Sequence, residues 1–134
     1  MYGSLDISTS GLVANRVRLE TISTNILNQD TILDAQGQYA PFQRRIAILA
    51  AGDPASGSSQ GVHVSHIEVA RDALVPRLEP DSPFADEEGM VWYPDINPVV
   101  EQMNAMEAMR AYEANIAVVE GTKSMISAAL ELLA

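Results

Sequence analysis

The feature that most restricts this chain is a long helix predicted near its C-terminal end. Asn97 and Pro98 form a helix start, with asparagine at the N-cap and proline in the first helical position. One helix is predicted from there to about Leu133, and at about 1.5 Å per residue it would span roughly 54 Å. A compact globule of 134 residues is only about 28 Å across on twice its expected radius of gyration. The helix therefore needs something outside a small domain to lie against.

A second helix is predicted at the other end of the chain, over about residues 6–28. Leucine or isoleucine recurs there every seven residues, at Leu5, Leu12, Leu19 and Ile26. Ile22 fills one intervening position of the repeat, and Ser8 and Asn15 occupy others. This spacing is typical of a coiled-coil seam, here a weak one. Many intervening residues are serine or threonine, which are poor helix formers, and Gly11 costs up to about 1 kcal/mol more. Because such a helix gains most of its stability from packing, we expect it to pair with the C-terminal helix.

The C-terminal helix is apolar over more than one narrow face. Apart from Lys123, its main stripe advances in steps of three and four, through Met109, Tyr112, Ile116, Val119, Ile126, Leu130 and Leu133. A second set lies beside it, at Met103, Met106, Val118 and Met125. One partner helix cannot cover both sets, so we expect an assembly interface. It would combine the main stripe with four residues of the first helix, Leu12, Leu19, Ile22 and Ile26. The alternative is a plain helical hairpin with a small β insertion.

The middle of the chain is predicted to be a small β-rich insertion, so the fold class is α+β. Extended segments are predicted at four places, 44–50, 62–69, 74–78 and 89–94. A change of phase at Ser65-His66 indicates a β-bulge or a strong twist in the second of these. The glycine- and serine-rich stretch 52–61 is predicted to be a flexible connection. The chain thus divides into three segments, the N-terminal helix over 1–28, the insertion over 29–97 and the C-terminal helix over 98–134.

Charge and composition exclude several classes of function. The formal net charge is −10, and 11 of the 18 acidic residues lie within 79–134. Such a balance argues against nucleic acid, whose phosphates are bound by Lys and Arg, and against anchoring on an anionic membrane. No stretch approaches the roughly 18 apolar residues of a membrane span. The absence of cysteine excludes disulfides and thiol catalysis, and the first residues do not resemble a cleaved secretory signal.

Three patterns resemble catalytic or metal-binding motifs, and none has the context that its chemistry needs. Gly57–Gly61 matches G-x-S-x-G around Ser59, but no apolar strand precedes it and no helix follows. His63 and His66 would point to opposite faces of a strand unless a bulge intervenes, and no cysteine completes a zinc set. The acids of the C-terminal helix, Glu101 among them, are interpreted as its solvated side. We predict no catalytic, cofactor-binding or metal-binding residues and no cofactor.

Motifs along the whole chain resemble those of bacterial flagellar basal-body rod proteins. The N-terminal part carries three of them, at residues 10–12, 18–20 and 25–31. In the last, Asn25-Ile26-Leu27-Asn28, leucine stands where the family usually has alanine. The C-terminal part carries two more, Ala111-Tyr112-Glu113-Ala114-Asn115 and Lys123-Ser124-Met125. The segments 78–86, 89–91 and 94–97 are similar to those of the proximal rod members of the family.

The resemblance implies a structural subunit of the proximal rod, whose terminal helices assemble into the tubular drive shaft that transmits torque across the periplasm. It implies export through the flagellar type III channel without a cleaved signal peptide. The implied partners are further subunits in a helical assembly, other proximal and distal rod proteins, and the junction with the membrane ring. Two other hypotheses remain: a coiled-coil adaptor unrelated to flagella, and a hydrolase that uses Ser59.

Overall fold

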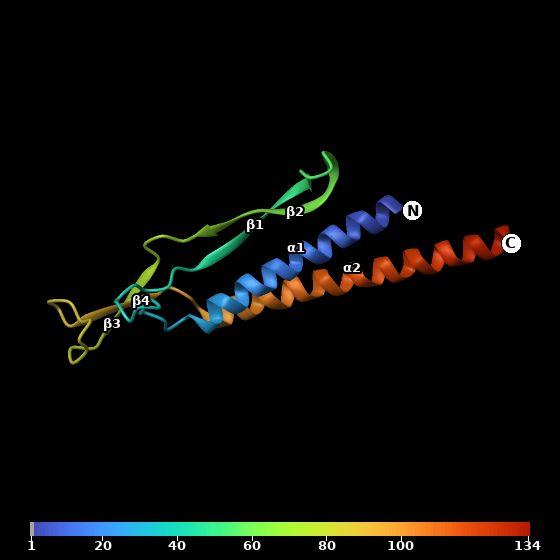
Figure 1. Ribbon diagram of the computed structural model, residues 1–134. Coiled ribbons are helices and arrows are strands. Elements are labelled where there is room, and N and C mark those ends of the chain that lie inside the picture. The colour runs from blue at the N-terminus through green and yellow to red at the C-terminus, as the bar shows by residue number, and fades with distance from the viewer. Residues whose placement is uncertain (1) are drawn as a thin grey trace.

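The structure is a computed structural model that describes residues 2–134, and it confirms the predicted α+β class. Helix α1 spans Tyr2–Leu27 and helix α2 spans Pro98–Leu133. Between them lie four strands, β1 (Arg45–Asp53), β2 (Ser58–Val69), β3 (Leu74–Leu78) and β4 (Met90–Pro94). The two helices run side by side in opposite directions, and α1 contacts α2 as well as the β1–β2 hairpin (Figure 1).

The seam between the two helices consists mostly of small and polar residues. On α2, the covered positions recur in alternating steps of four and three, at Glu101, Ala105, Ala108, Tyr112, Asn115, Val119, Thr122 and Ile126. This is coiled-coil spacing. On α1 the matching positions are Ser8, Gly11, Asn15, Arg18, Ile22 and Asn25. A Cβ at Gly11 would come within 2.7 Å of the Asn115 side-chain amide nitrogen, so glycine permits the close approach of the two backbones.

Three of the predicted seam positions on α1, Ser8, Asn15 and Ile22, lie in the observed seam, while the leucine and isoleucine repeat lies beside it. The seven-residue repeat of leucine and isoleucine is only half-buried, and Leu12, Leu19 and Ile26 each directly follow a seam residue. The physical reason is size, because small side chains at the seam let the helices approach more closely than leucines would. The other covered face of α1, which includes Ala14, is turned toward the hairpin. Helix α1 also begins earlier than predicted, at Tyr2.

Strands β1 and β2 form an antiparallel hairpin against α1. Their register shifts between Ile48 and Leu49, where Ser65 on β2 is left without a partner. This irregularity confirms the predicted bulge. Both strands extend into the stretch that was predicted to be a flexible connection, 52–61, so the turn itself is limited to 54–57.

Strands β3 and β4 form a second antiparallel pair, beyond the end of the helix pair where α2 begins (Figure 1). Val91 of β4 is fully buried. The Tyr39 hydroxyl donates to the Trp92 carbonyl oxygen at 3.0 Å and accepts from the Trp92 backbone N–H at 3.2 Å. The Tyr39 ring also stacks on Phe84, with ring centroids 5.7 Å apart. These contacts fasten the loop that follows α1 to β4.

The close contact at Gly11 generates a testable contrast with Gly121, where a Cβ would meet nothing within 4 Å. We expect Gly11→Val to force the helices apart and to lower the free energy of unfolding by about 1–3 kcal/mol, the usual range for overpacking. Gly121→Val should leave it unchanged or slightly higher, because valine is the better helix former. Thermal unfolding of the purified chain, followed by circular dichroism, measures both. Equal melting temperatures for the two variants would contradict the close approach.

Candidate assembly interface

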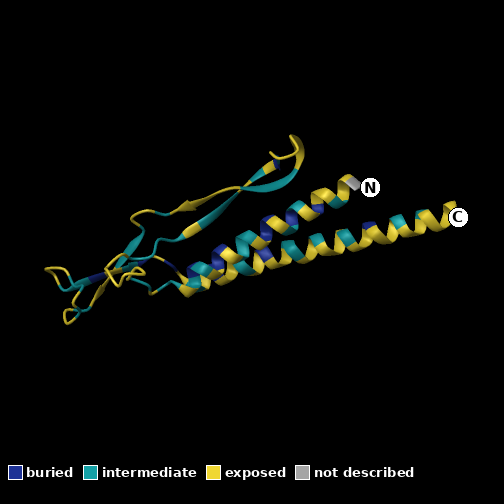
Figure 2. Cartoon of the chain, in the orientation of Figure 1, coloured by how far each residue is buried: buried dark blue, intermediate teal, exposed yellow. Residues whose placement is uncertain are grey.

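A broad apolar surface is exposed along α2. Most of α2 is coloured as exposed in Figure 2, with buried and half-buried residues recurring along it. Large apolar side chains outside the seam remain open to solvent. They include Met103, Met106, Met109, Ile116, Val118, Met125, Leu130, Leu132 and Leu133. Exposed apolar surface on this scale is typical of surfaces that contact another molecule. Within residues 2–134, no helix is long and apolar enough to cross a membrane.

The residues predicted to form the assembly interface fall into two groups. Four of α2 are exposed, namely Met109, Ile116, Leu130 and Leu133. The others are half-buried or buried, namely Leu12, Leu19, Ile22, Ile26, Tyr112, Val119 and Ile126. Ile22 is only 6% exposed, so its side chain belongs to the contact within the chain. The second apolar set of α2, predicted to lie beside the main stripe, is exposed at all four positions, Met103, Met106, Val118 and Met125.

The exposed stripe of α2 lies on the same side of the helix pair as the leucine repeat of α1. Leu12 and Leu19 directly follow seam residues of α1, while Met109 and Ile116 directly follow seam residues of α2. In an antiparallel pair, positions that follow the seam in this way lie on one common side. The hairpin occupies the opposite side of α1, where Ser10 contacts β2. The side away from the hairpin therefore carries a strip of apolar side chains, interrupted by Lys123.

Helix α2 extends past the beginning of α1. Gly11 lies against Asn115 and Asn25 contacts Glu101, so in this antiparallel register Tyr2 lies opposite about residue 124. The last turns of α2, over 127–133, thus project beyond the described part of α1 (Figure 1). At about 1.5 Å per residue this overhang is roughly 10 Å long. It carries three exposed leucines, Leu130, Leu132 and Leu133.

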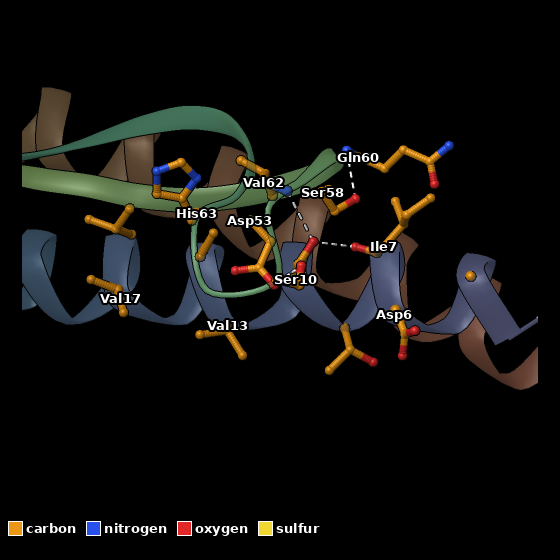
Figure 3. Close-up of a pocket in the computed structure, with 16 residues that line it drawn as sticks. Asp6, Ile7, Ser10, Val13, Val17, Asp53, Ser58, Gln60, Val62 and His63 are labelled. Atoms are coloured by element: carbon orange, nitrogen blue, oxygen red, sulfur yellow. Dashed lines mark hydrogen bonds between the residues drawn. The ribbon is translucent and has the colours of Figure 1, made fainter.

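A groove separates the first half of α1 from the β1–β2 hairpin (Figure 3). It encloses about 690 Å³ and is lined by apolar side chains such as Ile7 and Val13 and by the carboxylate of Asp53. The Ser10 hydroxyl joins the two walls, because it donates to the Ile7 carbonyl oxygen at 2.6 Å and accepts from the Val62 backbone N–H at 3.1 Å. The groove is thus held at a fixed width at this point.

The motifs that resemble catalytic or metal sites lie in ordinary strand and turn positions. Ser59 is exposed within β2, and His63 Nδ1 lies 2.7 Å from a backbone carbonyl oxygen. His66 is exposed, with its ring nitrogen 3.1 Å from a serine hydroxyl. A hydrogen bond from the Ser56 hydroxyl lowers the pKa of Asp53, as expected for a carboxylate that closes a turn. Within residues 2–134, no group of three or more His, Asp or Glu could hold a metal ion.

Glu101 is the clearest departure from the sequence analysis, which placed it on the solvated side of its helix. Its side chain is only 1% exposed. One carboxylate oxygen pairs with Arg44 Nε at 2.5 Å, and the other accepts from the Asn25 side-chain amide at 3.4 Å. Asn25 also donates to the Arg45 carbonyl oxygen at 2.7 Å and accepts from the Arg45 backbone N–H at 2.9 Å. One feature of the sequence is consistent with the burial of Glu101. It stands at the start of the four-and-three spacing that the covered residues of α2 follow.

Comparison with known proteins yields matches over nearly the whole chain. A sequence profile of the family described as "Flagellar basal body rod FlgEFG protein C-terminal" matches residues 87–132. The flagellar basal-body rod protein FlgC of Bacillus subtilis is 32% identical, over 98% of this chain and 97% of that protein. The protein of the same name in Borreliella burgdorferi is 33% identical, over 99% and 97%. That of Escherichia coli O6:H1 is 33% identical, over 95% and 93%.

The serine that joins the groove walls gives a second prediction. Ser10→Ala leaves the Val62 backbone N–H without its acceptor. Loss of such a hydrogen bond lowers the free energy needed to open the hairpin locally from α1 by about 1 kcal/mol. We therefore expect the Val62 amide to exchange with solvent deuterium about fivefold to tenfold faster. Ser23→Ala, at an exposed position of the same helix, is the matched control. Unchanged exchange at Val62 in the first variant would show that Ser10 does not hold the hairpin.

Proposed function

The chain belongs to the FlgC family of flagellar basal-body rod proteins, and we propose that it is a structural subunit of the proximal part of the rod. The observation that carries the proposal is the extent of the similarity, which covers nearly the full length of relatives named as rod proteins. We assign the chain no reaction, because the names of these relatives describe structural proteins. Its location is the flagellar basal body.

In this proposal the apolar surface of the helix pair is the contact between rod subunits. Met109, Ile116 and Leu130 are exposed on the side away from the hairpin, where a neighbouring helix pair would cover them. Repeated contacts that join unlike faces generate helical assemblies rather than closed pairs. The β strands then lie to the side of the helix pair and set the lateral spacing of subunits. Tyr112, Val119 and Ile126 contribute partly, since they also serve the seam within the chain.

The remaining features of the proposal follow from a place in the rod. The subunit passes torque along the shaft through its helices, and it meets other proximal and distal rod proteins and the junction with the membrane ring. It reaches the rod by flagellar type III export, without a cleaved signal peptide. The apolar overhang of α2, with Leu132 and Leu133 at its end, supports an end-to-end contact with the next subunit along the shaft.

A charge placed in the apolar strip tests the proposed contact. Ile116→Asp would put an unpaired carboxylate into a packed interface, which is strongly unfavourable. We expect it to abolish swimming in a strain that lacks its own copy of the gene and is complemented with the variant. Ile116→Leu keeps the position apolar and should preserve swimming, as should Glu87→Ala in the acidic turn. Normal swimming with Ile116→Asp would count heavily against this interface.

The overhang and the hairpin turn should differ in their tolerance of change. Deleting Glu131–Ala134 removes Leu132 and Leu133, each of which contributes about 1.5–3 kcal/mol if fully buried against a neighbour. We expect this truncation to stop swimming in the same complementation assay. Four Gly/Ser residues inserted after Ala55, within the turn, cost only a fraction of a kcal/mol in loop closure and should be tolerated. The reverse order of damage would refute the proposed role of the overhang.

A further inference from the structure

Most polar side chains in the seam satisfy their hydrogen bonds within their own helix. The Asn15 side-chain amide donates to the Gly11 carbonyl oxygen at 2.9 Å, and the Asn115 amide donates to the carbonyl four residues before it at 3.0 Å. The Thr122 hydroxyl donates in the same way at 2.8 Å. These bonds would survive if one helix slid along the other. They therefore do not determine which residue of α1 lies opposite which residue of α2.

The apolar part of the seam is equally permissive. Ala105 and Ala108 are small and resemble each other, and the larger apolar residues of the α2 seam, Tyr112, Val119 and Ile126, recur every seven residues. A shift by one heptad therefore replaces one apolar residue of α2 by another. Arg18 and Glu107 do pair across the helices at 3.4 Å, but the Glu107 side chain is 70% exposed. An ion pair so open to water contributes little. Apart from the fit at Gly11, the seam contains no other strong preference for one register.

We propose that Asn25, Arg44 and Glu101 form a clamp that sets the register of the helix pair and attaches the β1–β2 hairpin to it. The clamp joins three distant segments, since Asn25 lies in the last turn of α1, Arg44 precedes β1 and Glu101 lies in the first turn of α2. Asn25 engages both polar groups of the Arg45 backbone, so it also fixes where β1 begins relative to α1. Arg44 and Asn25 together occupy both oxygens of Glu101.

The energetic basis of the clamp is the buried carboxylate. A slip by seven residues that places Asn25 opposite Ala108 would leave Glu101 with neither an amide nor a guanidinium beside it. A slip in the other direction would bring Glu101 opposite Arg18, but it would separate Glu101 from both Asn25 and Arg44. Removing the partners of a buried charge is strongly destabilising, whereas a fully paired one is close to neutral. The clamp therefore adds little stability to the observed register and mainly destabilises the slipped registers. This is the same logic by which a buried asparagine selects one alignment in coiled coils.

Cysteine cross-linking can read the register directly, because the chain has no cysteine of its own. From the contact of Gly11 with Asn115, an antiparallel pair places Ser8 near Val119. The pair S8C with V119C reports the observed register. The pairs S8C with Y112C and S8C with I126C report slips of one heptad in either direction, which is about 10 Å. Mild oxidation of the purified full-length chain, followed by non-reducing electrophoresis, gives the yield of each disulfide.

In the parent chain we expect the S8C–V119C disulfide to dominate. In the Glu101→Ala background its yield should fall about tenfold, and one or both slipped pairs should appear. Glu101→Gln retains the length and an acceptor oxygen, so it should restore most of the S8C–V119C yield. Thr122→Ala is the matched control, because it removes a self-bonded polar group from the same seam and should change nothing. Parental S8C–V119C yield in the Glu101→Ala background would overturn the proposal.

A second measurement covers the case in which Glu101→Ala does not fold. The double variant Arg44→Gln with Glu101→Gln replaces the ion pair by a neutral hydrogen-bonded pair and should recover both helicity and the S8C–V119C disulfide. Failure of this double variant to recover them would overturn the clamp, as would absence of the disulfide in the parent chain. The clamp lies within one chain, so these outcomes do not depend on the proposed role in the rod.

Discussion

The close approach of α1 and α2 is the constraint on which the rest of the structure depends. Gly11 lies directly against Asn115, and most of the seam is built from small or polar residues such as Ser8, Ala108 and Thr122. Small side chains bury little apolar area, so the pair gains only modest stability from burial. The same arrangement turns the large apolar side chains of α2, such as Met109 and Ile116, away from α1. The small residues at the seam therefore have two consequences. The two helices pack closely within the chain, and the large apolar side chains of α2 lie on its outer surface.

Local signals in the sequence predicted most of the fold. Asn97 caps α2 as expected, with its side chain accepting the Val99 backbone N–H at 3.0 Å. The phase change at Ser65-His66 corresponds to the observed bulge. These features depend on a few adjacent residues, so a single sequence contains enough information to place them. The length of α2 likewise followed from its start signal and from apolar spacing that continues to Leu133 with Lys123 as its one interruption.

The seam and the buried carboxylate were not predictable in the same way. Periodicity analysis assumes that the largest apolar residues mark the inside of a fold, and here that assumption selected Leu12 and Leu19 over Gly11. In the assembly proposed above, large apolar residues also serve contacts with other chains. Glu101 was missed because its partners come from segments 57 and 76 residues away in the chain. Nothing near Glu101 in the sequence indicates that Asn25 and Arg44 will meet it.

In the proposed helical assembly, each subunit would need a defined internal register. A slip of one heptad would move the overhang of α2 by about 10 Å relative to α1 and the hairpin. Every contact that joins this subunit to the next would then be displaced, although the subunit itself would lose little apolar burial. Leucines at the seam would add stability but would tolerate such slips. A buried carboxylate with two required partners adds less stability and discriminates more strongly. For a part that must fit its neighbours at both ends, discrimination between registers is the more valuable property.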